Sequence, residues 1–190
     1  RRAQRPSVAR RLGLEAGHSA ETGHGVHLGW DDLATLLDSG AWLAHTARSN
    51  MGSQTGSATA GKFGVHACLG TDAASLDILA EAQVAWLKSR DAGQPIAVLR
   101  FLANGHRLAS AAFGKPLGPL RSGALADLVI LDYRPPTALD ATTLEAHLLH
   151  GLSARHVESV MVDGIWRLWA RKALGVKVDE LAAQSREAAK

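Results

Sequence analysis

The sequence is poor in cysteine, in aromatic residues and in long apolar runs. Its 190 residues include a single cysteine, Cys68, and aromatic side chains make up 5% of the chain. One cysteine excludes an intramolecular disulfide, and Cys68 lies in an apolar run. We therefore interpret it as a buried thiol and expect a reducing, cytoplasmic compartment. No stretch of about 18 apolar residues occurs, so we expect no transmembrane helix and no membrane partner.

Positive charge is concentrated at one end of the chain. Lys and Arg number 21 against 18 Asp and Glu, and residues 1–11 contain five arginines and no acidic residue. A nucleic-acid-binding face spreads its basic residues and interleaves aromatic ones, whereas the first 29 residues contain no aromatic residue. We therefore predict no nucleic-acid partner and interpret this segment as exposed helix surface.

Helical and strand-like segments alternate over residues 29–113. Apolar residues at helical spacing predict one helix between Gly29 and Gly40. A second helix is expected directly after Ser75, which can serve as its N-cap. A third is expected to begin at Pro95, because proline suits the first turn of a helix. Short apolar runs predict strands at 41–46 and 63–69, with a polar loop between them. This alternation is typical of βαβ units and a parallel sheet.

The pattern changes at Gly114, where a turn rich in Pro and Gly begins. Three apolar runs predict strands, and Asp163-Gly164 between the last two is a strong hairpin signal. The predicted strands are 125–132, 157–162 and 165–169, and the predicted helices are 142–149 and 178–190. We therefore divide the chain into an α/β part, residues 1–113, and a small β-rich module with helices, residues 114–190.

Two short motifs are candidates for chemistry. Gly70-Thr71-Asp72 follows an apolar run, and an aspartate at the end of a barrel strand can bind a metal and accept a proton. An aspartate that caps a following loop or helix would give the same pattern. Residues 56–62 match the phosphate-binding pattern G-x-x-x-x-G-K, but Phe63 replaces the required Ser or Thr. We interpret that segment as a flexible loop.

Histidines cluster before residue 30. His18 and Glu21 are spaced like a metal ligand and a general acid, and we interpret this pair as a coincidence. His24 and His27 lie three residues apart, which on a strand places them on opposite faces. Only one of the two can then line a site, and packing is the expected role of His27.

The ordered set of motifs resembles the amidohydrolase superfamily, in the branch of cytosine and guanine deaminases and chlorohydrolases. It is most similar to the aminohydrolases linked to selenium metabolism. The segments that carry the resemblance are His24-Gly25-Val26-His27-Leu28, residues 45–51, Leu69-Gly70-Thr71-Asp72, residues 122–132 and residues 160–164.

The resemblance implies the fold and the chemistry. The expected fold is a metal-dependent (β/α)8 (TIM) barrel with a small β-sandwich, of which this chain would be the C-terminal part, strands six to eight and the sandwich module. The family reaction is hydrolytic, with attack by a metal-bound hydroxide. By position, Asp72 matches the family's metal ligand and catalytic base, and His24 the catalytic histidine that orients the water. His45, Ser49 and Asn50 match the loop motif of strand seven, for which a structural or pocket-shaping role is expected rather than catalysis.

The chain departs from the family pattern in its metal ligands. The family's first His-x-His motif and the expected His-x-x-Glu motif are absent, so three of four ligands for zinc or iron are missing. We expect a hydrolase of non-peptide carbon–nitrogen bonds, an aminohydrolase or deaminase with a small heterocyclic substrate, in the intact parent. The present chain should bind no metal and be inactive alone. A truncated or degenerate relative that serves as an interaction module is the alternative, and homo-oligomerisation is left open.

Overall fold

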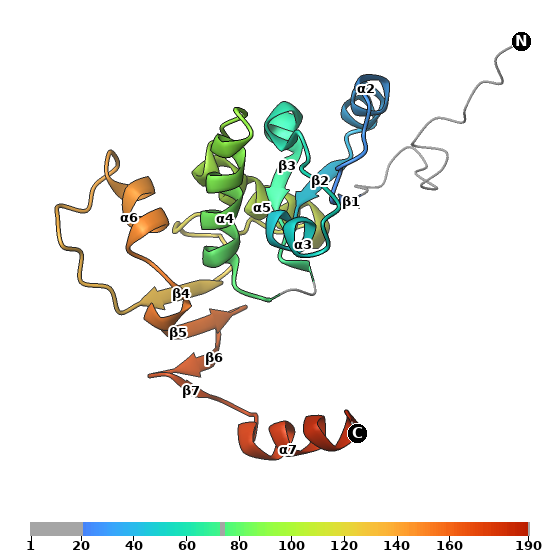
Figure 1. Ribbon diagram of the computed structural model, residues 1–190. Helices are drawn as coiled ribbons and strands as arrows, with labels where there is room; N and C mark the ends of the chain where they lie inside the picture. The colour runs from blue at the N-terminus through green and yellow to red at the C-terminus, as the bar shows by residue number, and fades with distance from the viewer. Residues whose placement is uncertain (1–20, 73–74, 190) are drawn as a thin grey trace, which may run out of the picture.

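The computed structural model describes residues 21–72 and 75–189 and contains two separate sheets (Figure 1). The helix expected near the N-terminus and His18 lie outside the described residues, as does the side chain of Glu21. Among the described residues, no helix is both long enough and apolar enough to span a membrane.

The first sheet contains three parallel strands in sequence order. They are β1 (Glu21–Gly23), β2 (Trp42–His45) and β3 (Ala67–Leu69). Thr22 pairs with Leu43, and Leu43 pairs with Ala67 on the other side. This confirms the parallel arrangement expected from the alternating pattern. It also places the carboxyl ends of all three strands at the same edge of the sheet.

Helices connect and cover these strands. The connections are α2 (Trp30–Asp38) between β1 and β2, then α3 (Ala47–Gly52) and the 3₁₀ helix η1 (Ala60–His66) between β2 and β3; α4 (Ile78–Asp91) and α5 (Val98–Phe113) follow β3. Figure 1 shows α4 and α5 beside β3. Leu36, Leu43, Phe63 and Phe101 are almost completely buried between the helices and the sheet. Each such side chain stabilises the fold by about 1.5–3 kcal/mol relative to exposure.

Four local expectations were wrong. The apolar run 63–69 is a strand only from Ala67, because Gly64 takes a left-handed φ of 55° that breaks the extended backbone. The first residues of the polar loop expected from residue 49 are instead helical, because they belong to the short helix α3. Asp77, rather than Ser75, caps α4 by accepting hydrogen bonds from two backbone N–H groups. Helix α5 begins three residues after Pro95, at Val98.

The second sheet is antiparallel and follows the chain order. Its strands are β4 (Leu128–Leu131), β5 (Val157–Val162), β6 (Ile165–Trp169) and β7 (Lys172–Ala173). Asp163 and Gly164 have φ angles of 49° and 76° and form the predicted hairpin turn between β5 and β6. Strand β7 was not predicted, because only two residues pair.

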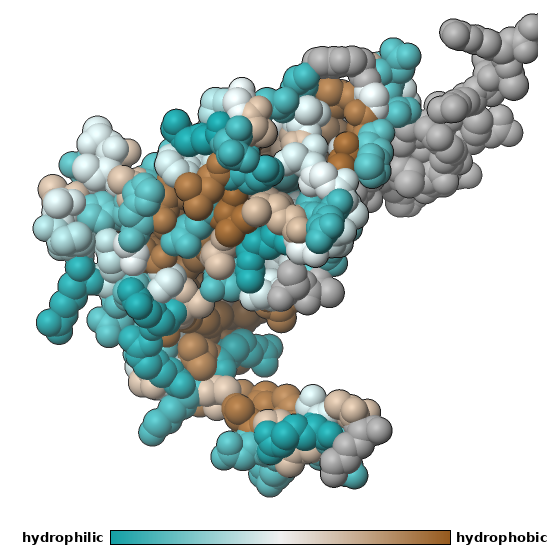
Figure 2. Space-filling view, in the orientation of Figure 1, coloured by the Kyte–Doolittle hydropathy of each residue, from teal (hydrophilic) through white to brown (hydrophobic). Residues whose placement is uncertain are grey.

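Two further helices and a turn of 3₁₀ helix accompany this sheet. They are α6 (Leu144–His150), η3 (Ala154–His156) and α7 (Val178–Ala188). Helix α6 packs on α4, and its Leu148 and Leu149 belong to the same core as the parallel sheet. By contrast, α7 buries none of its residues. Figure 2 shows apolar side chains on the surface around the antiparallel sheet and the start of α7.

Candidate active site

Polar side chains gather at the carboxyl edge of the parallel sheet. His24 follows β1, Thr46 follows β2, and Asp72 comes three residues after β3. Backbone bonds extend the ladder here, from His24 N to Ala44 O (3.1 Å) and from Gly70 N to His45 O (3.0 Å). This edge is where barrel enzymes keep their reactive residues.

The His24 ring is held at one of its two nitrogens. Its Nδ1 lies 2.8 Å from Asn50 Oδ1 and 2.9 Å from Thr46 Oγ1. An amide oxygen only accepts hydrogen bonds, so Nδ1 carries the proton that it donates to Asn50. In the neutral ring, Nε2 is then left with a lone pair. Thr46 and Asn50 therefore fix both the orientation and the tautomer of His24.

Asp72 lies on the other side of this ring. Its Oδ2 accepts a hydrogen bond from Ser49 Oγ at 2.6 Å and lies 3.6 Å from His24 Nε2. The side chains of His24 and Asp72 are 50% and 36% exposed. Solvent therefore reaches the space beside the two groups, where a carboxylate oxygen and an imidazole nitrogen face each other.

The backbone at both residues is unusual. His24 has a φ of 66° and Asp72 a φ of 49°. Residues other than glycine occupy this left-handed region at a cost of about 1–3 kcal/mol. Such conformations cluster at functional sites, where the surrounding structure holds them. Four other described residues that are not glycine also have a positive φ, so this conformation marks the pair only together with its hydrogen bonds.

His45 does not join the pair, although it belongs to the same sequence motif as Ser49 and Asn50. Side chains alternate along a strand, and because Thr46 points to His24, His45 points the other way, with its ring 6.5 Å from the ring of Phe101. It is buried, and burial lowers the pKa of its imidazole to about 4. His45 is therefore a neutral residue of the interface between sheet and helices.

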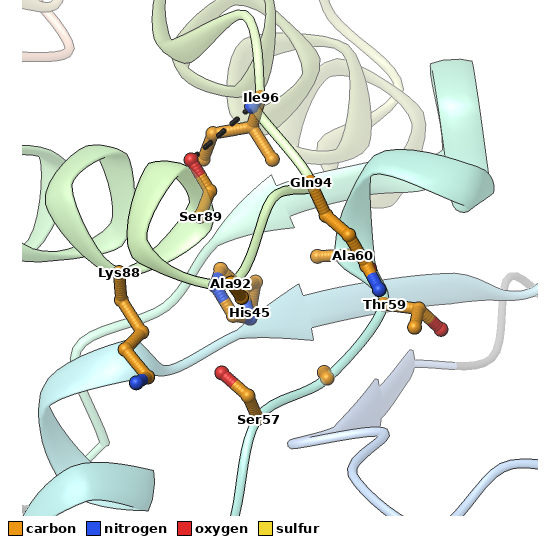
Figure 3. Close-up of a pocket in the computed structure, with 10 residues that line it drawn as sticks. His45, Ser57, Thr59, Ala60, Lys88, Ser89, Ala92, Gln94 and Ile96 are labelled. Atoms are coloured by element: carbon orange, nitrogen blue, oxygen red, sulfur yellow. Dashed lines mark hydrogen bonds between the residues drawn. The ribbon is translucent and has the colours of Figure 1, made fainter.

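His45 lines a small pocket on that side (Figure 3). Ser57 and Thr59 of the G-x-x-x-x-G-K segment contribute to its wall, opposite Lys88 at the end of α4. Its volume of about 50 Å³ is far below the roughly 300–1,000 Å³ of sites for small organic ligands. The charge of Lys88 is paired with Asp91 at 2.7 Å. We therefore do not assign the substrate to this pocket.

The phosphate-binding pattern lacks its structural context, as the sequence indicated. A P-loop links a strand directly to a helix. Here helix α3 separates the segment from β2, and Lys62 lies inside the 3₁₀ helix η1. The expected packing role of His27 was wrong, because its side chain is exposed.

The described residues do not complete a catalytic metal site. They contain no group of three His, Cys, Asp or Glu side chains placed to hold one ion. Catalytic zinc usually has three protein ligands, and among the described side chains the sheet edge offers only the Asp72 carboxylate and, beside it, His24 Nε2. The described residues therefore fit one part of such a site.

Comparison with known proteins gives the family. The sequence model of the Amidohydrolase family matches residues 8–167, and the chain belongs to this family. Two relatives are 5-methylthioadenosine/S-adenosylhomocysteine deaminases. The protein from Moorella thermoacetica is 30% identical over 85% of this chain and 40% of its own length; that from Thermococcus onnurineus is 31% identical over 78% and 37%. The chain spans about 40% of the length of the curated relatives it matches.

Solved structures support the fold. An adenosine deaminase from Xanthomonas campestris with bound zinc superposes with a TM-score of 0.75, at 20% identity, over 88% of this chain and 41% of that one. The atrazine chlorohydrolase of Arthrobacter aurescens, complexed with zinc, gives a TM-score of 0.70 at 19% identity, over 88% and 40%. The expected resemblance to the deaminase and chlorohydrolase branch is therefore confirmed.

Proposed function

We propose that this chain supplies part of the active site of a metal-dependent hydrolase that deaminates a small heterocyclic substrate. Family membership supports hydrolysis of carbon–nitrogen bonds. The observation that carries the proposal is the juxtaposition of His24 and Asp72 at the carboxyl edge of three parallel strands. We further propose that these strands are barrel strands six to eight and that residues 114–190 form a small β-rich module whose helix α6 packs on the barrel part.

In this proposal Asp72 and His24 both act on the water molecule that attacks the substrate. Asp72 is the general base, which accepts a proton from the water as the oxygen attacks the carbon that carries the amino group. The same proton then passes to the amino group, which leaves as ammonia. His24 accepts a hydrogen bond from the water at Nε2, which orients the attacking oxygen. Ser49 holds the Asp72 carboxylate in place.

A divalent metal, zinc or iron, would supply the acidity that makes a water reactive at neutral pH. We propose Asp72 as one of its ligands, because a carboxylate oxygen suits either ion. The bound zinc in related structures supports a metal in the family. The missing ligands would come from residues outside those described.

The function is tested by ammonia release from the longest protein that the gene encodes. Candidate substrates are 5′-methylthioadenosine, S-adenosylhomocysteine and guanine, chosen from the relatives' names. We expect Asp72→Asn and His24→Gln each to lower kcat about 10²–10⁴-fold. His27→Gln is the matched control, because His27 is exposed and three residues away. Full activity of Asp72→Asn would overturn the proposal.

Metal binding by the 190-residue chain is a separate prediction. With one carboxylate and one imidazole at the site, we expect less than stoichiometric zinc after dialysis, measured by plasma mass spectrometry. Asp72→Ala should leave that small amount unchanged. One equivalent of zinc that disappears in Asp72→Ala would show that this chain holds the ion without further ligands.

A further inference from the structure

Helix α3 begins without a cap from its own preceding residue. Thr46 occupies the N-cap position, yet its side chain makes no capping bond. Its hydroxyl lies instead 2.9 Å from His24 Nδ1. Threonine at this position ordinarily accepts a hydrogen bond from an N–H of the first helical turn. The first-turn N–H groups of α3 therefore require another acceptor.

Glu81, in the first turn of α4, is that acceptor. The backbone N–H of Arg48, in the first turn of α3, donates to Glu81 Oε1 at 3.2 Å. The side chain is 0% exposed. A buried carboxyl is costly unless it is hydrogen-bonded, and its Oε2 has no hydrogen-bonding partner among the described residues. The bond to α3 is therefore its main compensation, and a negative charge there suits the helix N-terminus.

Helix α3 in turn contacts both members of the proposed catalytic pair. Ser49 donates to Asp72 at 2.6 Å, and the next residue, Asn50, accepts from His24 at 2.8 Å. Consecutive helical residues point about 100° apart, so one short helix reaches two strand ends at once. A shift or rotation of α3 would lengthen both bonds together.

We propose that Glu81 is a positioning residue of the active site: it caps α3 in place of Thr46, leaves the Thr46 hydroxyl available to His24, and holds Ser49 and Asn50 against Asp72 and His24. The inference rests on the proposed function only in taking His24 and Asp72 as the reacting pair. It assigns a role to a buried acid that lies outside the motifs of the strand ends.

The test reads the tautomer of His24 in the 190-residue chain labelled with ¹⁵N-histidine. Ring nitrogen shifts at pH 8 report which nitrogen carries the proton, and His24→Gln assigns the resonance. Wild type should show the Nδ1–H tautomer alone. We expect Glu81→Ala to give a mixture of both tautomers, because α3 loses its acceptor and Thr46 is drawn back to cap it. Glu81→Gln should keep the wild-type tautomer, since its amide oxygen still accepts from Arg48.

Ser89→Ala is the matched control for a general loss of stability. Ser89 is a buried polar residue of the same helix, and it bonds to Trp86 and Ile96 but not to α3. It should lower the melting temperature and leave the His24 tautomer unchanged. If Glu81→Ala does not fold by circular dichroism, Glu81→Asp replaces it, because its carboxyl is one methylene too short to reach Arg48.

Because the readout involves no turnover, a negative ammonia assay would leave this result standing. The pattern that supports the proposal is loss of the single tautomer in Glu81→Ala or Glu81→Asp and its retention in Glu81→Gln and Ser89→Ala. A wild-type tautomer in a folded Glu81→Ala or Glu81→Asp would overturn it. So would a mixture of tautomers in Ser89→Ala.

Discussion

Burial of His45 links the stability of this protein to pH. The pKa of its imidazole falls from 6.5 to about 4 because burial disfavours the charged ring. The unfolded chain therefore takes up a proton below about pH 6.5, while the folded protein resists protonation until about pH 4. The stabilising contribution is fully present above pH 6.5 and is lost as the pH falls through 4.

We expect His45 to remove about 3 kcal/mol of unfolding free energy between pH 8 and pH 4. Urea denaturation at several pH values measures this slope. His45→Gln should flatten it, whereas His27→Gln, which alters an exposed ring, should not. Burial raises the pKa of the Glu81 carboxyl, which acts in the opposite direction. Because both variants retain Glu81, its effect cancels in the comparison. An unchanged slope in His45→Gln would contradict the prediction.

At the level of the element, the capping of α4 is a second testable feature. Asp77 Oδ1 accepts from the N–H groups of Leu79 and Ala80 at 3.1 and 3.0 Å. Ser75 Oγ accepts from Asp77 N at 3.3 Å, and the described residues show no bond from it to the first turn of α4. We expect Asp77→Ala to cost about 0.5–2 kcal/mol of unfolding free energy and Ser75→Ala distinctly less. Thermal denaturation of the two variants shows which residue is the cap. Equal losses of unfolding free energy in Asp77→Ala and Ser75→Ala would refute the assignment to Asp77.

The sequence predicts the elements that carry a periodic signal. Helix α2, the parallel order of the first sheet and the β5–β6 hairpin follow from apolar spacing and from the turn Asp163-Gly164. Helix α3 was missed because its six residues, Ala47–Gly52, have no apolar face, and it is held from outside by Glu81.

The candidate site was predictable only in part. The resemblance pointed to His24 and Asp72, because each ends a strand in a recognisable motif. Neither the bond from His24 to Thr46 nor the role of Glu81 has a local signal, since both depend on how distant segments pack. His45 was placed with Ser49 and Asn50 by motif, but strand alternation turns it to the other face.

At the scale of the whole molecule, apolar side chains remain on the antiparallel sheet. Ile165 and Trp169 of β6 are 55% and 51% exposed. Contiguous exposed apolar residues favour association. We expect sedimentation analysis of the 190-residue chain to show concentration-dependent association. Ile165→Lys should weaken it, whereas Leu120→Gln, an exposed residue outside both sheets, should not. A compact monomer at all concentrations would contradict this and favour a self-sufficient module.

The sequential order of the parallel strands has a consequence for synthesis. Residues paired between β1 and β2 are 21 apart in the chain, as for Glu21 and Trp42, and those between β2 and β3 are 24 apart, as for Leu43 and Ala67. Thr46, Ser49 and Asn50, which hydrogen-bond to His24 or Asp72, all lie before residue 73. Chains emerge from the ribosome at about 5–20 residues per second. The proposed catalytic pair can thus meet several seconds before α6 is made, and Leu148 and Leu149 join the hydrophobic core after that.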